Sequence, residues 1–250
     1  MVLRKNKKDS DVLIIDASKG FEKDGKNNKL RACDIKRIVD AYKERPEKIE
    51  KFARRVSRAE IIQNDYNLNI PRYVDSSEKA ESWDIYASMF GGIPEAELQD
   101  LSAYWTAFPH LKAALFSPDN EAYCRLNVAN LKNAVLSHPD VVAFKTAFQN
   151  AFGDFDAYLK SALIDGMTQL NAAGEEERLS REIFARLAEI PLVDRYAAYQ
   201  LLDDDWKKIA IDLEIIQTEG FAATKQVDPN MVLKKDAEVQ DGWVGHVLPL

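Results

Sequence analysis

The feature that most constrains this chain is a long run of regularly spaced apolar side chains between residues 193 and 216. Every third or fourth residue of the run is large and apolar: Tyr196, Tyr199, Leu202, Trp206, Ile209 and Leu213. That spacing puts the side chains on one face of an α-helix, which turns once in 3.6 residues. Such a face must be covered by the chain's own core or by a partner. The run therefore predicts a long helix at the centre of a helical region.

Three further segments show helical periodicity and are bounded by proline or glycine. They are Asn120 to Leu136, Pro139 to Phe152 and Glu176 to Ile190. The third has one apolar face, formed by Leu179, Ile183, Leu187 and Ile190. Alternating apolar and polar runs are rare in this part of the sequence. We expect residues 76–250 to form a mainly helical region.

The first 75 residues have a different character. Residues 11–17, DVLIIDA, are a short run of branched apolar residues with acidic ends, which predicts a buried strand. Residues 18–29 are rich in Lys, Asn and Gly and predict a loop. We expect Asp34 to cap a helix with an apolar face formed by Ile35, Ile38, Val39 and Tyr42. Ser57 and Glu60 have capping-box spacing, which predicts a second, short helix.

This order of strand, loop, helix and more strand-like sequence is typical of the end of an α/β domain. The expected fold class is α+β and mainly α: the tail of an α/β domain in residues 1–75, followed by a helical region in residues 76–250. The chain has 250 residues, enough for one large domain or two small ones.

Charge also divides the chain. Residues 1–60 contain 18 Lys and Arg against 11 Asp and Glu, a net +7, whereas the remaining residues contain 16 against 30, a net −14. A basic segment can lie near a phosphate backbone. The candidates for that role are Lys51, Arg54, Arg55, Arg58 and Arg72, and the alternative is a solvated basic surface.

No apolar run approaches the roughly 18–20 residues that cross a bilayer. The two cysteines, Cys33 and Cys124, lack CxxC partners, which fits free thiols in a reducing compartment. We therefore expect a cytoplasmic protein without a membrane partner.

Motifs for catalysis are missing from the sequence. There is no G-x-G turn for a dinucleotide-like cofactor, and Gly91-Gly92 is expected to be a turn between helices. There is no Pro-Pro, so the Asp/Asn-Pro-Pro-aromatic turn of amino-methyltransferases is absent, and Asn69 to Tyr73 is not accepted as a substitute.

Metal sites are not indicated either. The histidines, His110, His138 and His246, lack zinc-ligand spacing and are expected in turns or caps. Asp203 to Asp205 is expected to be a solvated acidic face. From motifs alone, no enzyme class stands out.

One stretch is far more specific than these. Residues 11–75 contain DVLIIDASKGF, KNNKLRACDIKRIVDAYKER, VSRAEI and, most distinctively, NDYNLNIPRYVD. They resemble the segment that closes the N6-adenine methylase domain in the modification (M) subunits of type I restriction-modification systems. The later segments AYWTAFPHLKAALF, VLSHPDVVAFKTAF, IPLVDRYAAYQLLDDDWKKIA and EVQDGWVGHVLP resemble the C-terminal region of one branch of that family.

The resemblance implies a multi-subunit enzyme. In this family two M subunits flank a specificity subunit that reads the DNA target, and a restriction subunit, a translocating nuclease, can join them. The M subunit binds S-adenosylmethionine and methylates adenine at N6, and its C-terminal helices pack against the specificity subunit. The family's cofactor loop and Asn-Pro-Pro-aromatic turn lie upstream of the segment that is similar here. No catalytic, cofactor-binding or metal residue is therefore carried over, and the chain alone is expected to be inactive.

Three hypotheses follow. The chain is part of an adenine-N6 DNA methyltransferase subunit that functions within its assembly, which contacts DNA. Alternatively, it is a non-catalytic interaction module, a truncated M subunit that binds the specificity subunit. A weaker alternative is a DNA-binding module that uses the basic residues 19–58. For the partner interface the candidates are Tyr196, Tyr199, Leu202, Trp206 and Ile209, which could equally form plain intramolecular core.

Overall fold

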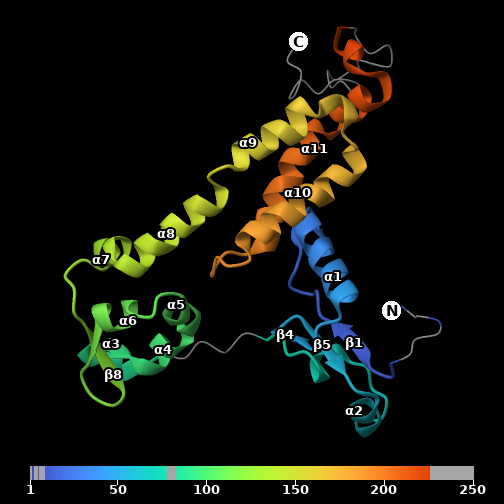
Figure 1. Cartoon of the computed structure of the whole chain (residues 1–250). Coiled ribbons are helices and arrows are strands. Elements are labelled where there is room, and N and C mark those ends of the chain that lie inside the picture. The colour runs from blue at the N-terminus through green and yellow to red at the C-terminus, as the bar shows by residue number, and fades with distance from the viewer. Residues whose placement is uncertain (1, 3–4, 6–8, 78–82, 226–250) are drawn as a thin grey trace. The chain divides into compact units, whose positions relative to one another are not determined.

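The computed structural model describes residues 2, 5, 9–77 and 83–225. The expected positions of His246 and of the segment EVQDGWVGHVLP lie outside these residues. The chain divides into two compact units, residues 1–81 and residues 82–250 (Figure 1). The described part is mainly helical with small antiparallel sheets, which confirms the fold class at that level. The predicted roles of residues 1–75 and 76–250 stay predictions.

The first unit is built on a small antiparallel sheet. Its elements are β1 (Val12–Ile15), β2 (Glu22–Asp24), β3 (Asn27–Lys29), α1 (Ala32–Glu44), β4 (Lys48–Ile49), β5 (Ala53–Val56), α2 (Arg58–Gln63) and the 3-10 helix η1 (Ile70–Arg72). The predicted strand is confirmed as β1, which pairs with β5 in the order β1-β5-β4, while β2 and β3 form a separate hairpin. Since β1 has one neighbour among the described strands, it lies at the edge of this sheet.

Both faces of the sheet are covered. Side chains alternate between faces along a strand, so Ile14 and Val56 lie on one face and Ile15 and Ala53 on the other. The first pair packs with α2 and with Tyr73 and Val74, all in one buried cluster. The second pair packs with Ala41 of α1, Phe52 and Ile49. The core of this unit is therefore split into two thin layers.

Helix α1 forms where it was predicted, but only one of the four residues of the predicted apolar face packs on the sheet. Ile38 does so together with Ala41, whereas Ile35, Val39 and Tyr42 are exposed. Asp34 does not precede the helix but lies in its first turn, where its carboxylate accepts the backbone N–H of Arg31 at 3.0 Å. Periodicity identifies helical spacing without showing which apolar residues find a neighbour.

The second short helix is confirmed. The Ser57 hydroxyl accepts the backbone N–H of Glu60 at 3.2 Å, which starts α2. The distinctive block that follows, residues 64–75, then folds back against the sheet. Its Tyr73 ring is buried, and its hydroxyl donates a hydrogen bond of 2.6 Å to the carbonyl of Asn67. The specific residues of this block thus have structural roles.

The second unit is helical apart from one small sheet. Its elements are α3 (Ile85–Phe90), β6 (Ile93–Pro94), α4 (Glu95–Asp100), α5 (Ser102–Ala107), α6 (Leu111–Leu115), β7 (Phe116–Pro118), β8 (Tyr123–Leu126), α7 (Leu131–Ser137), α8 (Pro139–Phe152), α9 (Phe155–Leu159), the π-helix η2 (Lys160–Asp165), the 3-10 helix η3 (Met167–Gln169), α10 (Ala172–Leu187), α11 (Arg195–Glu219) and the 3-10 helix η4 (Phe221–Lys225).

Two predictions near the small sheet were wrong. Residues 120–136 do not form one helix, because β8 pairs with β6 and β7 before α7 begins. Gly91-Gly92 joins a helix to a strand rather than two helices, with φ of 81° and 99°, values that glycine adopts without a steric cost. Strand pairing depends on residues distant in the sequence, so helical spacing alone could not reveal it.

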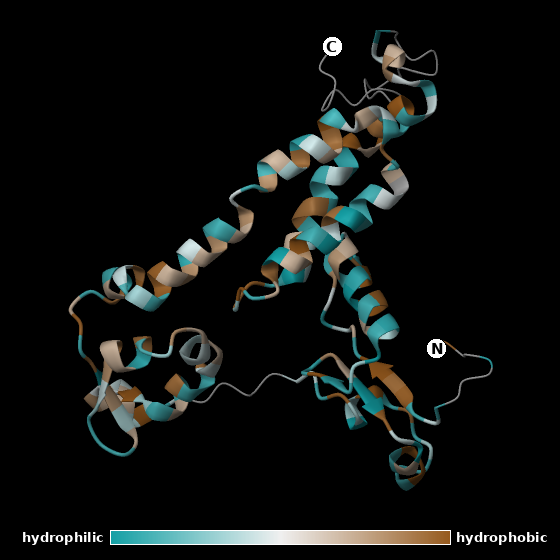
Figure 2. Cartoon of the chain, in the orientation of Figure 1, coloured by the Kyte–Doolittle hydropathy of each residue, from teal (hydrophilic) through white to brown (hydrophobic). Residues whose placement is uncertain are grey.

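The long helices were predicted well. Helix α8 has the predicted bounds, with Pro139 in its first turn and the ring of His138 as its cap. The apolar face of Leu179, Ile183, Leu187 and Ile190 is buried. Brown and teal positions alternate along α10 and α11 in Figure 2, as expected for helices with one covered face. Within the described residues, no helix has the length and apolar character needed to cross a membrane.

Candidate functional site

A polar pocket of about 300 Å³ lies in the first unit, where the loop after β1 meets the start of α1. Glycine at position 20 leaves room for Asp34, because a Cβ there would lie 2.8 Å from its Oδ1 and one of the two would have to shift. The loop can therefore approach the helix closely. The pocket is lined by Asp16, Ala17, Lys19, Gly20, Arg31, Asp34, Arg37, Glu50, Lys51, Phe52 and Ser76.

The buried carboxylate of Asp16 ties this pocket to the end of the distinctive block. It accepts the Ser76 hydroxyl at 2.6 Å and the backbone N–H of Ser18 at 3.0 Å. These hydrogen bonds, the Ser76 one above all, lower the pKa of Asp16 although burial acts in the opposite direction. Asp16 is thus ionised at neutral pH and joins residues 60 positions apart in the sequence.

A second carboxylate of the pocket is neutralised by an arginine. The Arg31 guanidinium donates two hydrogen bonds to Asp34, at 2.9 and 3.0 Å, and thereby lowers the pKa of Asp34. Asp34 also occupies the first turn of α1, where the helix dipole favours a negative charge. The pair fixes the position of the helix start and leaves little net charge of its own.

The five basic candidates from the sequence do not converge on one surface feature. Lys51 lines the pocket, in left-handed backbone with φ of 55°. Arg54 forms a two-pronged ion pair with Glu60, and Arg55 lies 3.4 Å from Asp11. Arg58 and Arg72 are exposed. Their proximity to DNA stays a prediction, and two of them already have carboxylate partners within the fold.

Two pocket cations, Lys19 and Arg37, were not among those candidates. Lys19 is exposed on the loop after β1, and the guanidinium carbon of Arg37 lies 4.2 Å from the centre of the Phe52 ring. The available indication was the position of Lys19 directly after a predicted buried strand, in a loop rich in lysine. Their convergence with Lys51 depends on the sheet and α1, which the sequence order does not show.

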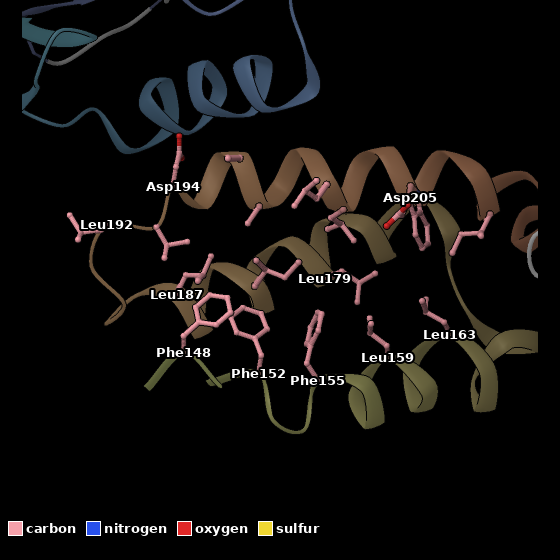
Figure 3. Close-up of a pocket in the computed structure, with 18 residues that line it drawn as sticks. Phe148, Phe152, Phe155, Leu159, Leu163, Leu179, Leu187, Leu192, Asp194 and Asp205 are labelled. Atoms are coloured by element: carbon pink, nitrogen blue, oxygen red, sulfur yellow. The ribbon is translucent and has the colours of Figure 1, made fainter. Parts of the chain in front are cut away.

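An apolar groove of about 660 Å³ lies in the second unit, between the α8–α9 segment and the helices α10 and α11. In Figure 3, the side chains of Phe148, Phe152, Phe155, Leu159 and Leu163 point from the α8–α9 side towards the other two helices. The lining is completed by Leu179, Ile183, Leu187, Leu192, Val193, Asp194, Ala197, Ala198, Leu201, Leu202, Asp205, Trp206 and Ile209.

The rim of this groove exposes large apolar side chains. Leu201 is 70% exposed, Leu192 43% and Phe148 39%. The carboxylates of Asp194 and Asp205 are the charged groups among the lining residues. Asp194 caps α11 by accepting the backbone N–H of Tyr196, and Asp205 is paired with Lys208. The groove is therefore suited to the apolar side of a protein helix.

The predicted interface residues divide between this groove and the surrounding core. Leu202, Trp206 and Ile209 line the groove, and Trp206 is buried. Tyr196 packs edge-on against Phe184 at 5.5 Å between ring centres. The Tyr199 hydroxyl donates to Glu176 at 2.5 Å, and burial with this carboxylate raises the pKa of Tyr199. Their role in partner binding stays a prediction, and the exposed rim leucines were missed because a buried and an exposed leucine look alike in sequence.

Other candidate groups have structural partners. His110 and His138 both place a ring nitrogen near Asp140 at the start of α8, as expected for cap and turn roles. Asp204 and Asp205 are exposed as expected, but Asp203 is buried and paired with Lys207. In the described ranges, no group of three His, Cys, Asp or Glu side chains is placed to hold a metal ion.

Comparison with known proteins relates the first unit to a class. Residues 1–82 match the family model of N-6 DNA methylases. Over this first third, the chain is similar to N-6 DNA methylases, as the resemblance of residues 11–75 predicted.

The particular proteins it is similar to are methylase subunits of type I restriction enzymes. The MpnII methylase subunit of Mycoplasma pneumoniae is 36% identical over 86 residues, 34% of this chain and 16% of that protein. The MjaVII methylase subunit of Methanocaldococcus jannaschii is 43% identical over 91 residues, with the same two coverages. The chain thus spans about one sixth of the length of these curated relatives.

A solved structure shows the same likeness in sequence. The type I restriction-modification methyltransferase subunit of Streptococcus thermophilus is 51% identical, over 30% of this chain and 16% of that one, with a TM-score of 0.29. The similarity of the helical second unit to the C-terminal region of these subunits stays a prediction.

Proposed function

We propose that this chain is part of the DNA-modification subunit of a type I restriction-modification system. Such a system uses S-adenosylmethionine to methylate adenine at N6 in complex with a specificity subunit and, for cleavage, a restriction subunit. The observation that carries the proposal is the match of residues 1–82 to N-6 DNA methylases. It is supported by relatives that are themselves subunits of type I restriction enzymes.

Neither the polar pocket of the first unit nor the apolar groove of the second suits the cofactor. The groove offers few polar groups for a ribose or an amino-acid moiety, since its lining is apolar apart from Asp194 and Asp205. In the polar pocket, the backbone at Gly20 is closed by Asp34, so it provides no open glycine turn. In this proposal the cofactor loop and the catalytic turn are supplied outside this sequence, and the chain contributes positioning and assembly.

The assembly role belongs to the groove of the second unit. A helix of the specificity subunit, with apolar side chains every three or four residues, would cover Phe148, Leu192 and Leu201. Burying apolar surface stabilises a complex by about 25 cal/mol per Å² before the costs of association.

Co-purification of the full chain with the specificity subunit of the same restriction-modification system tests this role. We expect a stable complex, and Leu201→Glu should abolish it by placing a charge in the apolar contact. Ile211→Glu is the matched control, since Ile211 is 48% exposed on the same helix but does not line the groove. Failure of the folded wild type to bind would overturn the assembly role, and equal binding by both variants would exclude the groove.

The main alternative is a non-catalytic interaction module, which the missing G-x-G and Pro-Pro motifs favour. It predicts the same complex but no methyl transfer by it. Incubation of the complex, purified from cells that also supply the cofactor loop and the catalytic turn, with duplex DNA and tritium-labelled S-adenosylmethionine separates the two hypotheses. Label in the DNA would show that the assembly is a methyltransferase, whereas a stable complex without label would support the interaction module.

A further inference from the structure

We propose that the polar pocket of the first unit binds a phosphate group of the DNA backbone through Lys19, Arg37 and Lys51. The choice of DNA as the source of the phosphate rests on the proposed function, whereas binding of a phosphate to the pocket does not. Of the five basic positions singled out from the sequence, only Lys51 lines this pocket. The pocket brings together residues from the loop after β1, from α1 and from the turn before β5.

The charges of the pocket favour an anion. Four cationic side chains line it, Lys19, Arg31, Arg37 and Lys51, against three carboxylates, Asp16, Asp34 and Glu50. Asp34 is engaged by Arg31, as described above. Glu50 lies 2.6 Å from the ammonium group of Lys48, which is not part of the lining. The remaining carboxylate of the lining is Asp16.

Asp16 is also poorly placed to repel a bound anion. Its oxygens accept hydrogen bonds from the backbone of Ser18 and the hydroxyl of Ser76, and the side chain is buried. Both donors offset its negative charge locally. Asp16 thus forms part of the pocket wall, while the cationic side chains make the electrostatic potential of the pocket positive.

The three cations are held in different ways that suit one phosphate. Arg37 lies against the Phe52 ring, which restricts its planar guanidinium, the group best matched to phosphate oxygens. Lys51 is exposed on the turn that precedes Phe52, and Lys19 is exposed on the loop after β1. A volume of about 300 Å³ is large enough for one phosphate group.

Binding of the full chain to a fluorescein-labelled 20-base-pair duplex, measured by anisotropy at several salt concentrations, tests the proposal. We expect Lys19→Ala/Lys51→Ala to weaken binding about tenfold at low salt and to reduce the slope of log affinity against log salt by about 1, the value for one lost phosphate contact. The matched control is Lys43→Ala/Lys145→Ala, which removes the same charge from exposed lysines away from the pocket.

Equal losses in the two double variants would show a general charge effect and overturn the site, as would a folded wild type that binds neither the duplex nor inorganic phosphate. A parallel titration with inorganic phosphate, followed by ³¹P NMR, identifies the source. Phosphate binding that is lost in Lys19→Ala/Lys51→Ala, with no duplex binding by the wild type, would keep the pocket as an anion site but exclude DNA. The co-purification experiment does not depend on either result, so failure of the pocket and failure of the proposed function remain distinguishable.

Discussion

The two units form their cores in different ways. In the first, a small sheet has thin apolar layers on both faces, and polar ties such as Asp16 to Ser76 and Tyr73 to Asn67 connect distant parts. In the second, long helices bury Leu179, Leu213 and Ile216 completely and leave an apolar groove beside them. We therefore expect specific hydrogen bonds to contribute more to stability in the first unit, and packed volume to contribute more in the second.

This difference bears on why the family likeness is concentrated in the first unit. A hydrogen bond between two side chains requires particular residues, whereas an apolar helix face accepts several residues of similar size. A fold held by polar ties therefore leaves a more distinctive sequence than a helical pair. The block of residues 64–75 is the clearest instance.

The largest effect is expected from a cavity in the helical core. Leu213→Ala should lower the free energy of unfolding by about 3 kcal/mol, because Leu213 has no exposed surface and the helices cannot fully close the gap. Urea unfolding followed by circular dichroism measures it. Ile211→Ala, on the same helix but 48% exposed, should cost much less. Similar losses would mean that packed volume is not what stabilises this unit.

Amide hydrogen exchange compares the units directly. We expect residues 9–77 to exchange about 30-fold faster than the slowest amides of α10 and α11, a difference of about 2 kcal/mol in opening free energy. The reason is that β1 is an edge strand among the described residues and the core beneath it is thin. Equal protection in the two units would contradict the comparison.

Removal of a buried hydroxyl in the distinctive block should also lower the free energy of unfolding, by somewhat less. Tyr73→Phe keeps the ring but leaves the carbonyl of Asn67 without this donor, and we expect a loss of about 1.5 kcal/mol. Thermal unfolding monitored by near-ultraviolet circular dichroism gives the value. Tyr66→Phe is the control, since Tyr66 is 66% exposed in the same block. If both variants were as stable as the wild type, the Tyr73–Asn67 hydrogen bond would make no measurable contribution to the free energy of unfolding.

The smallest expected effect is on the free energy of unfolding and its dependence on pH. Because hydrogen bonds lower the folded-state pKa of Asp16, its contribution to stability is present above the unfolded value near 3.8 and is lost as pH falls through the folded value. Ser76→Ala should cost about 1 kcal/mol at pH 7 and make the unfolding free energy less dependent on pH below about 4. Urea midpoints between pH 2.5 and 7 test this, with Ser137→Ala in the second unit as the control. If the unfolding free energy of Ser76→Ala depended on pH below about 4 as it does in the wild type, the Asp16–Ser76 hydrogen bond would be excluded as the cause of that dependence.

Much of the local structure could be read from the sequence. The Pro139 start of α8, the Ser57 cap of α2 and the apolar face from Leu179 to Ile190 depend on residues close together in the chain, so short-range spacing was sufficient. The predictions failed where distant residues decide. Residues 123–126 become a strand because β6 and β7 lie on either side of them, and α1 turns Ala41 rather than Ile35 to the sheet.

The candidate sites show the same limit. The sequence by itself determined the methylase likeness of the first third, the helical character of the rest and the uneven charge, because these are properties of composition and local order. Only the tertiary structure decided that Lys19, Arg37 and Lys51 share a pocket, that Arg54 pairs with Glu60, and that Leu201 is exposed while Trp206 is buried. Convergence and exposure depend on how elements pack across the fold, and spacing along the chain carries no information about that.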